Sequence, residues 1–201
     1  MNKKRKILFA IPFMLSISLP EYDEEIIYEI SAAVLHKNGH DFEVIWSYRL
    51  DEESWKGKGT LKIYGKDYLN LELPFMEVLI KKSIMSVKYP EEDQVLIDYF
   101  NRRDSSNLFA VLLSEFDGFI VDEISMQGED ISLKLIPETL IGFEMLKLTV
   151  SDKNWMPKTI HAISGREMEV SVNILSFEPL EDVKALISKE LDASEIIDLR
   201  D

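Results

Sequence analysis

The feature that most constrains the fold of this chain is a two-residue alternation of apolar and polar side chains. In the segment 41–50 most odd positions are polar or charged, and the even positions carry Phe42, Val44, Trp46, Tyr48 and Leu50. Successive side chains of a strand point to opposite faces, so this segment predicts a strand with one apolar face and one solvated face. Strands of this kind belong to an antiparallel sheet that water wets on one side.

The same alternation recurs along most of the chain, with turn residues between the segments. The alternating segments are 61–63, 69–73, 76–80, 85–89, 131–135, 146–150 and 168–174. Glycine, Asp, Asn and Ser mark turns at 57–59, 65–67, 128–130, 152–154 and 164–165. A meander of this size must curl, close or be capped. The predicted fold class is therefore α+β, a curved antiparallel sheet or incomplete β-barrel of about 10–11 strands under a lid of 2–3 helices.

Three segments can supply that lid. Segment 24–36 has apolar residues at spacings of three and four, acids in its first turn, and Asn38-Gly39 as a stop signal. Segment 107–116 places Leu108, Val111, Leu112 and Phe116 on one helical face, and a third helix is predicted near 181–191. We expect all three to cover the apolar, concave face of the sheet.

The first residues of the chain have the pattern of a secretory leader. Lys3, Lys4, Arg5 and Lys6 precede an uncharged, mostly apolar run at 7–19, which Pro20 and a group of acids end. At about 1.5 Å per residue a helix of this run is shorter than the roughly 30 Å hydrocarbon core. We expect residues 1–18 to be a signal peptide and 19–201 to form a single domain. A buried first element and an uncleaved anchor remain alternatives, since large Leu19 follows the small-residue triplet at 16–18.

Charge and composition exclude several functions. The chain carries 23 Lys and Arg against 37 Asp and Glu, a net charge of −14. Four of the basic residues lie in the leader, which leaves 19 for the remainder and a net charge near −18. A nucleic-acid binder needs a basic face, so this class is disfavoured. The chain has no Cys, which excludes disulfides, thiolate metal sites and a Cys nucleophile.

The search for catalytic and metal-binding motifs is almost empty. His36 and His40 are four residues apart, but Asn38-Gly39 separates them, and no third ligand stands at a fixed spacing. The chain contains no G-x-S-x-G, no phosphate loop and no dinucleotide fingerprint. We therefore expect no cofactor, no metal and no enzymatic activity, although a pair of carboxylates that converge in space would leave no sequence signal.

The apolar face is the remaining candidate site. Met76, Met85, Met145 and Met168 would give it an adaptable lining. Any single apolar residue also fits ordinary core packing, but a curved sheet under a lid can enclose a concave apolar site. We expect an apolar ligand to contact the strand residues Phe42, Trp46, Tyr48, Ile63, Leu71, Val78, Met85, Leu133 and Leu146. From the lid we expect contacts by Ile27, Ile30, Leu108 and Leu112.

The order of these elements resembles the outer-membrane lipoprotein carrier (LolA-like) family, from the first helix to about Pro179. The resemblance rests on Gly59-Thr60-Leu61-Lys62-Ile63, Tyr68-Leu69-Asn70-Leu71, Pro74-x-x-Glu77, Tyr89-Pro90 with Gln94-Val95, Leu133-Lys134-Leu135-Ile136-Pro137, the strand 146–150, the turn 152–154, Met156-Pro157 and the strand 168–177. The family's lid-latching arginine has no counterpart, since Gly65 and Lys66 stand there, and Lys81-Lys82-Ser83 replaces its D-G-K turn. The resemblance implies an incomplete barrel with a helical lid and acyl chains bound between them.

Three functions follow from these observations. The first is an exported carrier, periplasmic or envelope-associated, that holds acyl chains or lipoproteins. The second is a regulatory or assembly module of the same fold that contacts an envelope protein partner. The third, less favoured, is a hydrolase. The acidic charge disfavours direct docking on anionic membranes, so we expect a membrane to be reached only through a partner protein.

Overall fold

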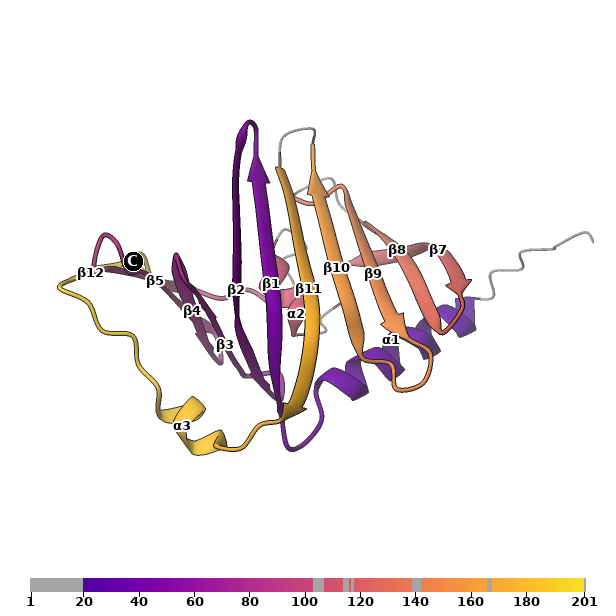
Figure 1. Ribbon diagram of the computed structural model, residues 1–201, viewed down its shortest axis with the longest axis horizontal. Helices are drawn as coiled ribbons and strands as arrows, with labels where there is room; N and C mark the ends of the chain where they lie inside the picture. Colours follow the sequence, from indigo (N-terminus) through magenta and orange to yellow (C-terminus); the bar gives the residue numbers. More distant parts are fainter. Residues whose placement is uncertain are drawn as a thin grey trace, which may run out of the picture.

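A single, strongly curved sheet organises the molecule. The computed structural model describes residues 20–102, 107–113, 116, 118–138, 142–165 and 168–200. Twelve strands form the sheet in the order β12-β6-β5-β4-β3-β2-β1-β11-β10-β9-β8-β7, and all neighbours are antiparallel except β12 and β6. The two ends of the sheet do not meet (Figure 1). The predicted incomplete barrel is confirmed, with twelve strands in the described residues where 10–11 were expected.

The helices and strands have the following bounds. The helices are α1 (Pro20–Val34), α2 (Leu108–Leu112) and α3 (Val183–Ser188). The first six strands are β1 (His40–Leu50), β2 (Glu53–Tyr64), β3 (Tyr68–Leu73), β4 (Met76–Lys81), β5 (Ile84–Tyr89) and β6 (Gln94–Tyr99). The others are β7 (Phe119–Gln127), β8 (Asp130–Pro137), β9 (Met145–Ser151), β10 (Pro157–Ser164), β11 (Met168–Pro179) and β12 (Glu195–Asp198).

Two glycines bend β2 where the sequence predicted a turn. Gly57 and Gly59 lie inside β2, so the turn predicted at 57–59 is wrong. A Cβ on Gly59 would lie 2.0 Å from the carbonyl oxygen of Glu72, and one on Gly57 would lie 3.0 Å from Pro74 and Phe75. The absent side chains let β3 and its turn to β4 approach β2 closely at these two positions.

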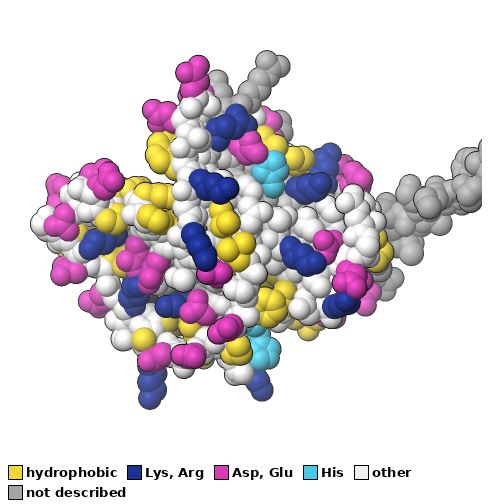
Figure 2. Space-filling model, in the orientation of Figure 1, with side chains coloured by type: hydrophobic (Ala, Val, Ile, Leu, Met, Phe, Trp, Pro, Cys, Tyr) yellow, Lys and Arg dark blue, Asp and Glu magenta, His cyan; other side chains and the backbone are white. Residues whose placement is uncertain are grey.

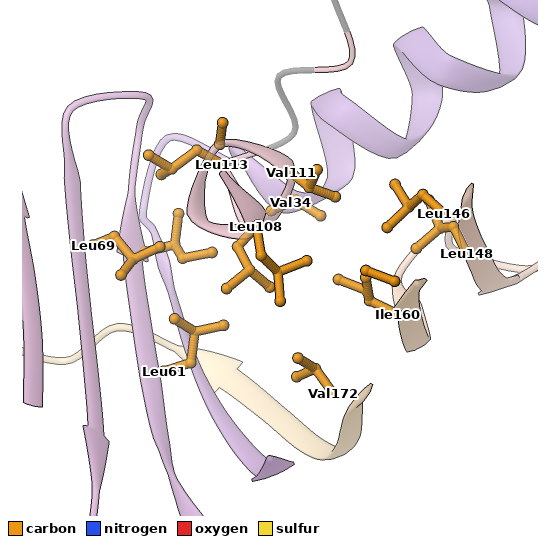
Figure 3. Packing of buried hydrophobic residues seen from close by; sticks show 14 of the residues in the cluster. Val34, Leu61, Leu69, Leu108, Val111, Leu113, Leu146, Leu148, Ile160 and Val172 are labelled. Carbon is orange, nitrogen blue, oxygen red and sulfur yellow. The ribbon is translucent and has the colours of Figure 1, made fainter. Parts of the chain in front are cut away.

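The inner, concave face of the sheet forms the core together with α1 and α2. Ile26, Ile30 and Val34 of α1 are buried in the same apolar cluster as Leu61 of β2 and Leu148 of β9. Figure 3 shows Leu108, Val111 and Leu113 of the α2 segment reaching into the space between β2–β3 and β9–β11. Helix α1 begins at Pro20, which suits the first helical turn because its missing N–H is not needed there. The predicted helix 24–36 is thus confirmed with its bounds shifted toward the N-terminus.

The third helix lies on the opposite face from the one we predicted. Leu186 of α3 and Leu180, which precedes the helix, pack with Leu79 of β4 in a small cluster that is separate from the main core. Figure 1 shows α3 apart from α1 and α2. The prediction that it covers the concave face is wrong, and a β-bulge gives the reason. Ile174 pairs with Val44 but Ser176 pairs with Glu43, so the extra residue reverses the alternation and directs Leu180 outward.

The expected leader, residues 1–18, lies outside the described residues. None of the helices that the structure describes is long and apolar enough to cross a bilayer.

Candidate functional site

The interface between the inner face of the sheet and the two helices α1 and α2 is the candidate site. The residues predicted to line it do lie there. Those buried in the core are Phe42, Trp46, Ile63, Leu71, Val78, Leu133, Leu146, Ile30, Leu108 and Leu112. Those partly buried against it are Tyr48, Met85 and Ile27. All thirteen lie at the interface between the sheet and the two helices, and their contact with a ligand stays a prediction.

The interior is filled by the protein's own side chains. The cavity under the helices measures about 20 Å³, which is room for about one water molecule. Four of the thirteen predicted residues border it, namely Ile30, Phe42, Ile63 and Leu112. The sequence analysis did not assign to the ligand lining the others that border it, which are Val34, Leu61, Val111, Phe116, Leu148, Pro157, Ile160 and Ile174. An acyl chain can therefore bind here only if some of these side chains move.

The cavity residues that were not predicted to line the site differ in how far the sequence could have identified them. Leu61, Leu148 and Ile174 belong to alternating segments and were open to the same argument as their neighbours. Pro157 and Ile160 lie on β10, whose sequence shows no sustained alternation, and no local signal marks them. Of the four methionines expected in the lining, Met76, Met85 and Met168 pack against the core. Met145 is on the outer side, because Leu146 and Leu148 occupy the inner face of β9.

Among the described residues, helix α2 is attached to the sheet by apolar contacts. Asn107 caps it by accepting a hydrogen bond from the Phe109 N–H at 3.0 Å. Between described residues, every hydrogen bond of α2 stays within the segment 107–113. Its contacts with the sheet are apolar, including a stack of the Phe109 ring on Trp46 with centroids 5.9 Å apart. Apolar contacts have no fixed partner geometry, so α2 is held by burial rather than by specific bonds.

His40 joins the end of α1 to the start of β1. Its Nε2 lies 3.0 Å from the carbonyl oxygen of Ala33, to which it donates in the neutral tautomer. Its Nδ1 is buried and has no hydrogen-bond partner in the described part of the chain. Burial lowers the pKa of His40 below 6.5, and the neighbouring His36 acts in the same direction, while the bond to Ala33 opposes the shift. The arrangement favours a neutral imidazole that caps the last turn of α1.

The outer face of the sheet is charged and internally paired. Figure 2 shows Lys, Arg, Asp and Glu side chains mixed across it. Glu169 accepts from both Arg49 and His161, the latter at 2.6 Å, and the Arg49 guanidinium is the main cause of the lowered pKa of Glu169. Lys58 pairs with Glu43 at 2.5 Å. Such cross-strand pairs each contribute little to stability but keep the face soluble.

A wide groove of about 800 Å³ lies between α3 and the outer face of the central strands. Asp41, Glu43 and Glu178 line its floor, and Lys189 lines its far side. Burial raises the pKa of Asp41, with Lys62 opposing the shift. Within the described residues, no group of three or more His, Asp or Glu side chains is placed to hold a metal ion.

No family model matches the sequence, and no curated protein matches it. Solved structures are similar in fold. One is an uncharacterized conserved protein from Thermus thermophilus, at 9% identity and a TM-score of 0.59, covering 88% of this chain and 99% of that one. Another is a DUF1329 family protein from Desulfovibrio piger, at 10% identity and a TM-score of 0.52, covering 84% and 96%.

The fold that the LolA-like resemblance predicted is confirmed. A LolA superfamily protein from Nitrosomonas europaea also matches, at 9% identity and a TM-score of 0.48, covering 83% of this chain and 97% of that one. At these identities the likeness concerns the fold, and function must be argued from the site.

Proposed function

We propose that this protein is an exported, non-enzymatic carrier that binds acyl chains, free or attached to lipoproteins, between the half-barrel and helices α1 and α2. The observation that supports this most is the way α2 fills the interior. The α2 segment places apolar side chains between strands β2–β3 and strands β9–β11 (Figure 3). Among the described residues, α2 is joined to the sheet by apolar contacts and not by hydrogen bonds. An acyl chain can replace such contacts with contacts of the same kind.

Burial of the α2 side chains and burial of an acyl chain contribute free energies of similar size. Leu108, Val111, Leu112 and Leu113 are each at most 6% exposed. Burial of an aliphatic side chain contributes about 2 kcal/mol, or roughly 8 kcal/mol for the four. Ten buried methylenes of an acyl chain contribute about the same, at about 0.8 kcal/mol each. An exchange between two nearly equal occupants needs no covalent step and is readily reversible, as a carrier requires.

Native mass spectrometry after incubation with monopalmitoylglycerol tests this proposal. The expected result is an additional mass of one or more lipids on the wild-type protein. The variant Phe109→Ala removes the ring that stacks on Trp46 and weakens the competing α2, so it should bind several-fold more tightly, since such a stack contributes about 1 kcal/mol. Tyr99→Ala, at a ring that is 65% exposed on β6, is the matched control and should bind like wild type. A clean unliganded mass for all three proteins would contradict the carrier function.

A second function is favoured by the same filled interior. If α2 stays in place and the cavity beside it remains at about 20 Å³, no acyl chain can enter. The fold would then serve as an envelope module that contacts a protein partner. A pull-down from envelope extract with the purified protein separates the two functions. A carrier should return lipid and no stoichiometric protein, and a module should return one stable partner.

Export and recruitment complete the proposal. Export rests on the basic and apolar residues 1–18, and a periplasmic or envelope location follows from it. The acidic charge of the remainder opposes tight binding to anionic lipid surfaces, so a protein partner would bring the carrier to a membrane. Fractionation of cells that express the full chain tests this, and recovery with the soluble cytoplasmic proteins would contradict it.

A further inference from the structure

An apolar strip leads from the core to the surface along the β1–β2 hairpin. It consists of Trp46, Tyr48, Leu50, Trp55 and Phe109. Trp46 is 4% exposed, whereas Trp55 is 41% exposed and Leu50 is 40% exposed. Because β-strand side chains alternate, Trp46, Tyr48 and Leu50 follow one another on the inner face of β1. The strip is therefore continuous with the interior at one end and open to solvent at the other.

Ring stacking makes this strip an ordered surface. Tyr48 and Trp55 are directly paired across β1 and β2, and their rings stack with centroids 5.4 Å apart and an interplanar angle of 27°. One step inward, Trp46 stacks on Phe109 of α2 at 5.9 Å and 21°. Val170 and Met168 of β11 pair with Tyr48 and Leu50 and extend the apolar surface sideways.

The outer end of the strip lies at the end of the sheet that helix α1 does not cross. Helix α1 crosses the end of the sheet where β1 begins, and the β1–β2 hairpin projects at the other end (Figure 1). Phe109 belongs to α2, the segment that cargo must displace, so the inner end of the strip meets the place where displacement starts. A chain that slides along Trp55 and Tyr48 would reach the Trp46–Phe109 stack first.

Among the described residues, the charges around the outer end are predominantly acidic. Asp51 and Glu52 form the exposed hairpin turn, and the equally exposed Glu53 is the first residue of β2. Arg49 nearby is already bonded to Glu169, which leaves Lys56 as the other basic residue of the hairpin end. A carboxylate or phosphate head group at this position would meet like charge, and a neutral head group would not.

We propose that the apolar strip is the opening through which an acyl chain reaches the interior, and that the acidic turn selects chains with neutral head groups. This inference rests on the carrier function proposed above. It adds the route and the chemical class of ligand, which are acyl glycerides or amide-linked chains in preference to free fatty-acid anions.

Stopped-flow binding with monopalmitoylglycerol and palmitate, which carry the same chain, tests both parts. Trp55→Ala should slow association of monopalmitoylglycerol about tenfold, equivalent to about 1.4 kcal/mol. Trp55→Phe keeps an aromatic ring and should restore most of the rate. Tyr99→Ala, exposed on β6 far along the sheet order from the hairpin, should leave the rate unchanged. Circular dichroism and the unfolding midpoint confirm that each variant is folded.

A separate variant, in which the acidic residues of the hairpin end are neutralised, tests the head-group preference. Wild type should bind monopalmitoylglycerol about tenfold more tightly than palmitate, which is again about 1.4 kcal/mol. The combined change Asp51→Asn, Glu52→Gln and Glu53→Gln should reduce this ratio to about twofold. If wild type binds neither lipid, the carrier function and the opening both fail. If wild type binds but Trp55→Ala associates at the wild-type rate, the opening is wrong and the carrier function stands. An unchanged ratio in the combined variant would refute the head-group selection.

Discussion

Gly59→Ala is the sharpest test of how closely β3 approaches β2. The added Cβ would lie 2.0 Å from the Glu72 carbonyl oxygen and 2.8 Å from Leu73 Cδ2. A carbon and a carbonyl oxygen normally approach no closer than about 3.3 Å, so β2 and β3 would have to separate by roughly 1.3 Å. Adjacent strands are about 4.8 Å apart and are fixed by hydrogen bonds. The clash is with backbone, and no rotamer change relieves it.

The expected cost follows from that geometry. Overpacking a core with one extra carbon typically costs 1–3 kcal/mol when side chains can shift. Here a backbone carbonyl must move, so we expect a loss of about 3 kcal/mol or more in the free energy of unfolding. For a chain of this length that corresponds to a fall in Tm of about 6–12 °C. Since whole domains are stable by only about 5–15 kcal/mol, the variant should be visibly weakened.

Urea unfolding followed by tryptophan fluorescence measures this loss, with two matched glycine controls. At Gly57 the nearest atoms, 3.0 Å away, belong to the side chains of Pro74 and Phe75, which can shift, so Gly57→Ala should cost about 1 kcal/mol. At Gly165 no atom lies within 4 Å and the strain comes from its φ of +61°, so Gly165→Ala should also cost about 1 kcal/mol. If Gly59→Ala lowers the free energy of unfolding no more than these two variants do, the close approach of β3 to β2 is refuted.

Three further predictions follow from single contacts. Because the folded pKa of His40 is lowered, the unfolded chain binds the extra proton first, so its contribution to stability is complete above pH 6.5 and is lost as the pH falls below that value; His40→Gln should flatten the urea midpoint between pH 7.5 and 5.5, and His36→Gln, which removes only a smaller cause of the shift, should flatten it less. Deletion of Leu175, the bulge residue that is 48% exposed, should turn Leu180 inward and expose the C-terminal segment to carboxypeptidase, whereas Leu175→Ala should leave it protected. Asn107→Ala removes the cap of α2 and should speed amide hydrogen exchange in residues 108–113 by about fivefold, the equivalent of about 1 kcal/mol; unchanged exchange would show that the cap does not hold α2.

The inner face of the sheet was predictable because its signal is local. Each alternating segment names its own buried residues, and in β3, β8 and β9 these are the residues that the structure buries. In β1 the same holds for Phe42, Val44 and Trp46, whereas Tyr48 is partly buried and Leu50 is exposed. The strands β7 and β10 were not predicted because neither sequence shows a sustained alternation of apolar and polar residues. The parallel pairing of β12 with β6 joins segments about a hundred residues apart, and nothing in either segment indicates it.

The outer location of α3 and the filled interior could not be predicted, for a different reason. A single extra residue in β11 decides which face Leu180 meets, and the amphipathic pattern of 181–191 is the same for either face. Whether the concave space is empty depends on how far the side chains of Leu108, Val111 and Leu113 reach between strands β2–β3 and strands β9–β11. Curvature and depth are tertiary quantities, and residue spacing carries little information about them.

The two segments that leave the central sheet are held in ways that suit different tasks. Helix α2 is joined to the sheet, among described residues, by apolar contacts alone. The C-terminal segment is joined by ion pairs of Lys189 with Glu72 and Glu77, and by the ladder of β12 on β6. In the carrier function proposed above, displacement of α2 would exchange one apolar surface for another and break none of these polar bonds. The edge of β6 would therefore stay covered by β12 while cargo enters and leaves, and this strand would not be exposed to other chains.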